Sequence, residues 1–180
     1  QQNENSSFIA DFSLTRGYKS SLSDKKNSIS HLFAKFDTDL KFQNFDTSNL
    51  YLSVQKVTND TYLKVFDTNL PETKLKPNSQ SSLTSEIKLS LGREDYNFTT
   101  GIKSFENLGV SNNDRYQYIL PYYNFDKQLF SNFEKGSISF SSNGSNDLNN
   151  TNNLRTKIIN DLNFQSLDII TDYGFRNEYN

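Results

Sequence analysis

Apolar and polar side chains alternate along the segment from His31 to Gln43, which reads HLFAKFDTDLKFQ. Successive side chains of a strand point to opposite faces, so this period of two predicts a strand with one apolar and one polar face. Strands of soluble proteins usually stop after about five or six residues. A longer strand with one charged face is typical of a transmembrane barrel. The expected lipid-facing residues are Leu32, Ala34, Phe36, Leu40 and Phe42. The expected lumen-facing residues are Lys35, Asp37, Asp39, Lys41 and Gln43.

The same alternation recurs along the rest of the chain, and about nine strands of roughly ten residues are expected in all. Further alternating segments are 8–14, 50–54, 87–91, 138–140, 158–164 and 167–175. Long loops are expected at 17–29, 59–81, 106–113 and 144–152, short turns at 44–48, 93–95 and 165–166, and a linker at 125–134. Short turns at one end and long loops at the other are typical of outer-membrane barrels. The pattern therefore predicts an all-β fold, an antiparallel transmembrane outer-membrane β-barrel fragment.

The composition agrees with a barrel and excludes several other classes. Hydrophobic residues make up only 33% of the chain, yet aromatic residues reach 14%. A barrel strand needs only one apolar residue in two, so this content is sufficient. The chain has no cysteine, which excludes disulfides and thiol nucleophiles. With 19 basic and 21 acidic residues it has no basic stripe for nucleic acid.

The chain begins at Gln1 and contains no methionine, which suggests a mature product or a fragment. Residues 1–180 are expected to form part of one outer-membrane β-barrel domain. The remaining strands and a periplasmic domain would then belong to the parent protein, because an open set of strands leaves unpaired edges in lipid.

Catalytic chemistry has little support in the sequence. His31 is the only histidine, and no G-x-S-x-G or phosphate-binding loop accompanies it. Its place at a strand start predicts a solvated or interfacial histidine. We therefore expect no enzyme activity, no catalytic or metal-binding residues and no cofactor. A lipid-cleaving barrel that uses His31 is the remaining catalytic alternative.

Two groups of polar and aromatic residues carry weaker indications. The charges at 35–41 would line a hydrated lumen, and their near-neutral sum argues against a strongly ion-selective pore. The tyrosines near the expected strand ends fit an aromatic girdle, although ordinary packing explains them as well. They are Tyr116, Tyr118, Tyr122 and Tyr123.

Several stretches resemble the barrel domain of the LPS-assembly protein family, LptD, also called OstA or organic solvent tolerance protein. One is the strand and turn at 31–58, which runs into NDTYLKVFD at 59–67, similar to the family's entry to an outer loop. Another is NDRYQYILP at 113–121, which resembles a later strand ending on a proline. The resemblance covers most of the chain but only the first part of the family's barrel.

The resemblance implies transport of lipopolysaccharide and its insertion into the outer leaflet of the outer membrane of a Gram-negative bacterium. It implies three partners besides membrane lipid: lipopolysaccharide, a small plug lipoprotein (LptE-like), and a periplasmic bridge protein (LptA-like) that docks through the absent N-terminal domain. No catalytic residues carry over. A generic porin or receptor barrel and a secreted soluble β-sandwich adhesin or glycan-binding module remain alternatives.

Overall fold

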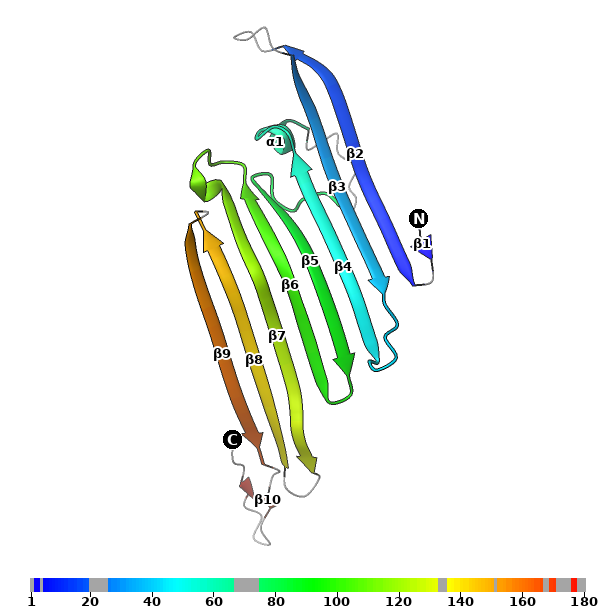
Figure 1. Cartoon of the computed structure of the whole chain (residues 1–180), viewed down its shortest axis with the longest axis vertical. Coiled ribbons are helices and arrows are strands. Elements are labelled where there is room, and N and C mark those ends of the chain that lie inside the picture. The colour runs from blue at the N-terminus through cyan, green and yellow to red at the C-terminus, as the bar shows by residue number, and fades with distance from the viewer. Residues whose placement is uncertain are drawn as a thin grey trace.

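One antiparallel sheet dominates the computed structural model (Figure 1). The structure describes residues 2–3, 5–19, 26–66, 75–132, 136–150, 152–166, 169–170 and 176–177. Each strand pairs with the next along the chain, in the order β1 to β9. The strands are β1 (Gln2–Asn3), β2 (Ser6–Lys19), β3 (Lys26–Asp39), β4 (Thr47–Val57), β5 (Ser82–Arg93), β6 (Tyr96–Asn107), β7 (Tyr116–Asn132), β8 (Gly136–Asn149) and β9 (Asn153–Gln165). The predicted all-β class is confirmed.

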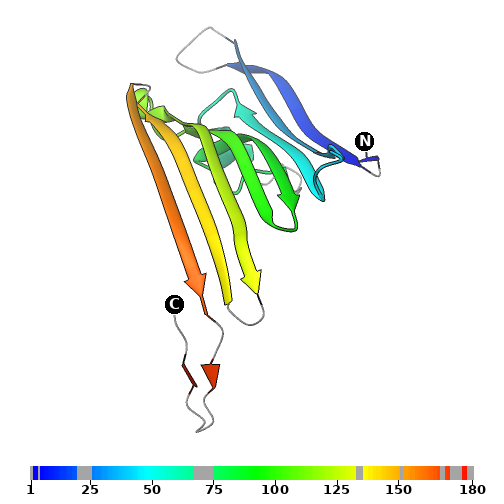
Figure 2. The same ribbon diagram turned by 60° about the horizontal axis from the view of Figure 1, so that its bottom comes forward.

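The sheet is open among the strands that the structure describes. β9 pairs with β8 alone, and β2 pairs with β3 and with the two residues of β1. Figure 2 shows the strands as one curved layer, with helix α1 (Tyr62–Phe66) to one side of it. A 3-10 turn, η2 (Asn113–Arg115), precedes β7. Two short strands, β10 (Ile169–Ile170) and β11 (Arg176–Asn177), pair separately.

Strand register gathers the alternating residues onto two faces. Phe36 lies opposite Phe8 and Leu52, and Leu52 in turn lies opposite Ile87, so their side chains share one face. We call this the apolar face. It holds Phe8, Phe12, Leu32, Ala34, Phe36, Leu52, Ile87, Ile102, Phe125, Phe140, Ile158 and Leu162. The opposite side is the polar face, with Asp11, Lys35, Asp37, Tyr51, Lys88, Lys103, Tyr122, Asn124, Asn143 and Lys157.

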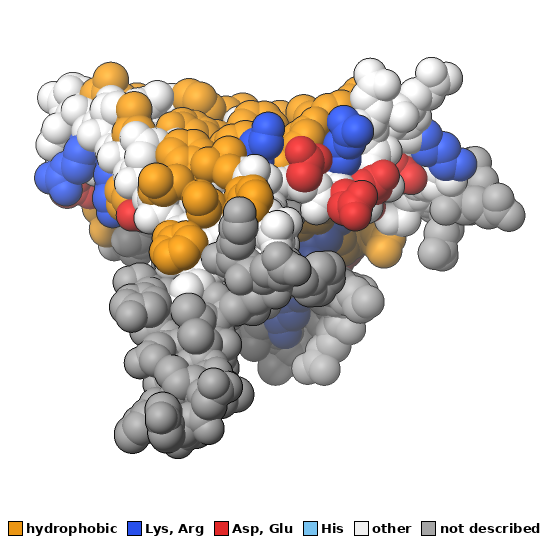
Figure 3. Space-filling model, turned by 90° about the horizontal axis from the view of Figure 1, so that it is seen from below, with side chains coloured by type: hydrophobic (Ala, Val, Ile, Leu, Met, Phe, Trp, Pro, Cys, Tyr) orange, Lys and Arg blue, Asp and Glu red, His pale blue; other side chains and the backbone are white. Residues whose placement is uncertain are grey.

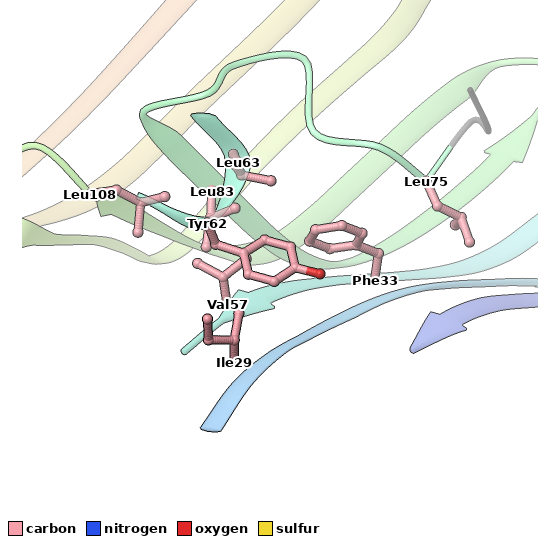
Figure 4. Close-up of a cluster of buried hydrophobic side chains, with 8 residues drawn as sticks. All are labelled: Ile29, Phe33, Val57, Tyr62, Leu63, Leu75, Leu83 and Leu108. Carbon is pink, nitrogen blue, oxygen red and sulfur yellow. The ribbon is translucent and has the colours of Figure 1, made fainter. Parts of the chain in front are cut away.

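A small core lies at the end of the sheet where β4 leads into α1, here called the cap end, and Ile29, Phe33 and Val57 enter it from the polar face. The cap, residues 58–66 and 75–81, covers it. Phe33 and Leu83 are fully buried there (Figure 4). The whole cluster comprises Ile29, Phe33, Val57, Tyr62, Leu63, Leu75, Leu83 and Leu108.

β3 ends earlier than predicted. It stops at Asp39, and the backbone of Lys41 takes a positive φ of 51°, which a strand does not accommodate. The Leu40 amide donates to the carbonyl of Ser48, which closes the turn to β4. Leu40, Lys41, Phe42 and Gln43 therefore lie in this turn rather than on the predicted faces of a strand. It lies at the opposite end from the cap, here called the turn end.

Several predicted loops are strand instead. β2 extends to Lys19 and β3 begins at Lys26, so the loop predicted at 17–29 is wrong in extent. The linker at 125–134 belongs largely to β7, and the loop at 144–152 largely to β8. Asn, Ser and Gly have low strand propensity, but β8 pairs on both sides and these neighbours decide its conformation.

The strand predicted at the end of the chain and the proline motif also differ. In the described part of 167–175 only Ile169 and Ile170 form strand, and 167–168 and 171–175 lie outside the described residues. β7 continues past Pro121 rather than ending there. A register shift between Ile119 and Tyr122 lets this strand hold a residue that has no N–H to donate.

Candidate functional site

The apolar face is exposed across the whole sheet. Leu162 of β9 is 70% exposed and Phe12 of β2 is 65% exposed, although both are large hydrophobic side chains. Others on this face with exposed side chains are Phe8, Leu14, Leu32, Ile87, Ile102, Leu154, Ile158 and Phe164. Figure 3 shows hydrophobic side chains gathered along the upper surface in that view. Monomeric soluble proteins rarely expose an apolar patch that spans a whole sheet, so this face marks an interaction surface.

Aromatic rings border the apolar face at the turn end. Phe45 lies 6.1 Å from Tyr96, and Tyr96 lies 6.3 Å from Phe125, measured between ring centroids. Phe42, Phe98 and Phe140 extend this row across the sheet. The row was not predicted, although the aromatic residues in and beside the short turns at 44–48 and 93–95, namely Phe42, Phe45 and Tyr96, are a signal that could have indicated it.

The predicted tyrosine girdle is only partly present. At the cap end Tyr116 stacks on Tyr118 with a centroid distance of 6.4 Å, as expected for residues near the start of a strand. Tyr122 and Tyr123 instead lie within β7, on opposite faces. The apolar face is therefore bordered by a row of rings at the turn end and by a tyrosine pair at the cap end.

The polar face carries charged side chains that largely neutralise one another. The Tyr122 hydroxyl donates a 2.6 Å hydrogen bond to Glu86, and the Lys103 ammonium lies 3.2 Å from the same carboxylate. The Asn49 amide donates to Asp37 at 2.9 Å. Opposite charges thus lie within one layer of side chains, so the face is polar without a strong net sign.

Of the ten residues predicted to face lumen or lipid, six lie on β3. Lys35, Asp37 and Asp39 project to the polar face. Leu32, Ala34 and Phe36 project to the apolar face. The two groups thus lie on opposite faces of β3, as the alternation of polar and apolar residues predicts.

A compact ion cluster joins the cap to the strands beside it. Glu106, only 6% exposed, accepts from the Lys56 ammonium at 2.7 Å and from Arg115 Nη2 at 2.7 Å. The Tyr116 hydroxyl donates to the same carboxylate at 3.1 Å. Arg115 Nη2 also donates to Asp60 of the cap at 2.6 Å. The hydrogen bond from Arg115 lowers the pKa of Asp60, and the bonds to Asp60 and Glu106 raise the pKa of Arg115.

His31 is buried rather than solvated, so that prediction is wrong. Its side chain is 3% exposed and stacks on Phe33 at 4.6 Å. Nδ1 lies 2.6 Å from the Tyr62 hydroxyl, and Nε2 lies 3.2 Å from Asp11 without hydrogen-bond alignment. Burial and the negative charge of Asp11 raise the pKa of Tyr62. Sequence alone did not show that the cap folds back over β3, and this contact is what buries the ring.

The burial of His31 gives a substrate no access to its ring, so the contacts assign it a role in holding the cap. The described residues contain no group of three or more His, Asp or Glu side chains placed to bind a metal ion. Within the same residues, no helix is long and apolar enough to cross a membrane. Comparison with protein-family models, curated proteins and solved structures found no match to this chain.

Proposed function

We propose that this chain forms part of the wall of an outer-membrane β-barrel, with the apolar face toward lipid and the polar face toward an aqueous interior. The observation that carries the proposal is the exposed apolar face, which runs from β2 to β9. Lipid is a solvent in which such a face is stable, because it replaces the water that these side chains would otherwise contact.

The dimensions of the sheet support the same proposal. Apolar-face residues extend along β9 from Leu154 to Phe164. At a rise of about 3.4 Å per residue this is about 34 Å along the strand. A tilt of about 40° reduces the height to roughly 25 Å, which is the height of the apolar band of such barrels. The aromatic rings at both ends of the face support the proposal, because barrels of this kind carry aromatic girdles at both ends of their apolar band.

A soluble β-sandwich is a weaker explanation of this geometry. Its two sheets pack face to face and cover each other's apolar side chains. Among the described residues, the only other sheet is the pair of two-residue strands β10 and β11, and the apolar side chains of β9 remain exposed. The open edge of β9 is also consistent with a barrel wall that continues into further strands.

We propose further that the barrel carries lipopolysaccharide into the outer leaflet, as the family resemblance implies. The balanced charges of the polar face suit a sugar-bearing cargo better than the selective passage of one kind of ion. The partners under this proposal are lipopolysaccharide, an LptE-like plug lipoprotein and an LptA-like periplasmic bridge protein. Localisation in the outer membrane of a Gram-negative cell follows from the same proposal.

Photocrosslinking in living cells tests both parts of this proposal. A photoreactive residue replaces either Asp37 on the polar face or Phe36 on the apolar face. The two positions are adjacent in β3, so the probes differ mainly in the face that they report on. We expect the probe at 37 to capture lipopolysaccharide and the probe at 36 to capture phospholipid. Phospholipid capture at 36 without glycolipid capture at 37 would favour a generic porin or receptor barrel. Loss of both signals would contradict a membrane location.

A further inference from the structure

A hollow of ≈ 210 Å³ lies on the polar face between β7, β8 and β9. Strand register builds it from two adjacent layers of side chains. Tyr122, Ser145 and Lys157 lie opposite one another in one layer. Asn124, Asn143 and Ile159 form the other. Six side chains from three neighbouring strands therefore surround one recess.

The position of Tyr122 keeps this recess open. A Cβ on Gly101 of β6 would lie 2.8 Å from the Tyr122 hydroxyl, so the ring extends over this glycine. The hydrogen bond to Glu86 and the Lys103 ammonium 4.8 Å from the ring centroid hold it there. The tyrosine therefore leans toward β5 and β6 and leaves the space beside β8 empty.

Three polar side chains around the recess are open to solvent, whereas the group around Glu86 on the same face is paired. Glu86, Tyr122 and Lys103 bind one another, and Asn49 binds Asp37. The side chains of Asn124, Asn143 and Lys157 have no hydrogen bond, ion pair or ring contact with any described residue. Two amides and one ammonium thus face the recess with their donors and acceptors unused.

We propose that this recess binds one sugar unit of the glycolipid, an inference that rests on the proposed function. Amide groups both donate and accept, so Asn124 and Asn143 match the hydroxyls of a sugar. Lys157 supplies a cation for a phosphate substituent, and Ile159 an apolar surface for the carbon side of the ring. The volume is below the roughly 300–1,000 Å³ of sites that enclose a whole drug-sized ligand, so the recess holds one unit of a longer chain.

Equilibrium binding to the parent barrel in lipid nanodiscs tests this proposal. The probe is radiolabelled phosphorylated core oligosaccharide released from lipopolysaccharide. Loss of one amide hydrogen bond of about 1 kcal/mol corresponds to about a fivefold increase in Kd, so we expect this increase for Asn124→Ala and for Asn143→Ala. Asn49→Ala is the matched control, because its amide lies on the same face but already binds Asp37. It should leave Kd unchanged.

A second comparison isolates the ammonium. Wild type should bind the phosphorylated probe more tightly than the dephosphorylated one, and Lys157→Gln should remove that preference. Equal Kd values for wild type and both alanine variants, or no binding by wild type, would overturn the sugar site.

Spin labels at Phe36 and Asp37 in the same nanodiscs distinguish this failure from failure of the proposed function. If the label at 36 contacts lipid and the label at 37 contacts water, the barrel wall stands and only the sugar site is lost. If neither label contacts lipid, the barrel wall itself is wrong.

Discussion

The two halves of this sheet are built from the same kind of strand but are supported differently. Every buried hydrophobic side chain in the described residues lies in β3 to β5, in the cap or directly after β6. β7 to β9 contain none, and all thirteen residues of β9 are exposed. The first half thus has a core of its own. The second half depends on strand pairing and on the medium, lipid or water, that contacts its two faces.

Removal of the central core side chain should show the largest effect. Phe33→Ala leaves a cavity where the ring packs against His31 in the cap-covered cluster. We expect a loss of about 3–5 kcal/mol in the free energy of unfolding. Leu162→Ala in β9 should cost much less, because lipid fills the space that its side chain leaves. Urea unfolding of both variants of the parent barrel in phospholipid vesicles measures the difference, and equal losses would mean that the halves share one kind of support.

A charge on the apolar face of the second half should show the next largest effect. Ile158 and Ile159 are identical neighbours in the middle of β9, and their side chains lie on opposite faces. In vesicles, Ile158→Arg should cost about 2–4 kcal/mol, as expected for an arginine near the bilayer midplane. Ile159→Arg projects to the polar face and should cost far less. Equal costs would contradict the assignment of lipid to one face.

Loss of the arginine that ties the halves together should have a smaller effect. Arg115→Ala removes one cation from buried Glu106 and leaves Lys56 and Tyr116 as its partners. We expect a loss of about 1–3 kcal/mol, the usual cost of leaving a buried polar group less satisfied.

An exposed ion pair is the control for this variant. Arg93 and Asp95 lie 3.9 Å apart at the turn end, and both side chains are about half exposed. Arg93→Ala should therefore change the unfolding free energy by about 0–1 kcal/mol. A comparable loss for both variants would show that the burial of Glu106 does not matter.

The alternation of apolar and polar residues was sufficient to predict the all-β class and the two faces of β3. Strand ends were harder, because the alternation continues through Leu40, Lys41, Phe42 and Gln43 although the backbone turns at Lys41. Side-chain patterns carry no information about backbone φ at a polar residue. The later part of β8, residues 144–149, was predicted as a loop for a related reason, since pairing with both neighbours overrides the low strand propensity of its Asn, Ser and Gly residues.

The tertiary contacts could not be predicted from local pattern. Lys56 and Glu106 are fifty residues apart in sequence, and His31 meets Tyr62 only because the cap folds over β3. The recess at Asn124 and Asn143 depends on which residues lie opposite each other across three strands, and on the glycine that lets Tyr122 lean away. Such contacts depend on the register between neighbouring strands, and the sequence of one strand does not predict that register.

Acid should loosen the contact between the cap and η2, and this is the smallest effect that we expect. Asp60 binds Arg115 at 2.6 Å, and this bond lowers its pKa below the usual 3.8. A carboxylate with a lowered folded-state pKa contributes stability above the unfolded value, and the contribution is lost as pH falls through the folded value. The protection of the α1 amides, measured as the exchange rate relative to the intrinsic rate at the same pH, should therefore fall below about pH 4. Asp60→Asn removes this group, so its α1 amides should be less protected at neutral pH and should lose less protection in acid. An identical pH profile for the variant and wild type would show that Asp60 does not hold the cap.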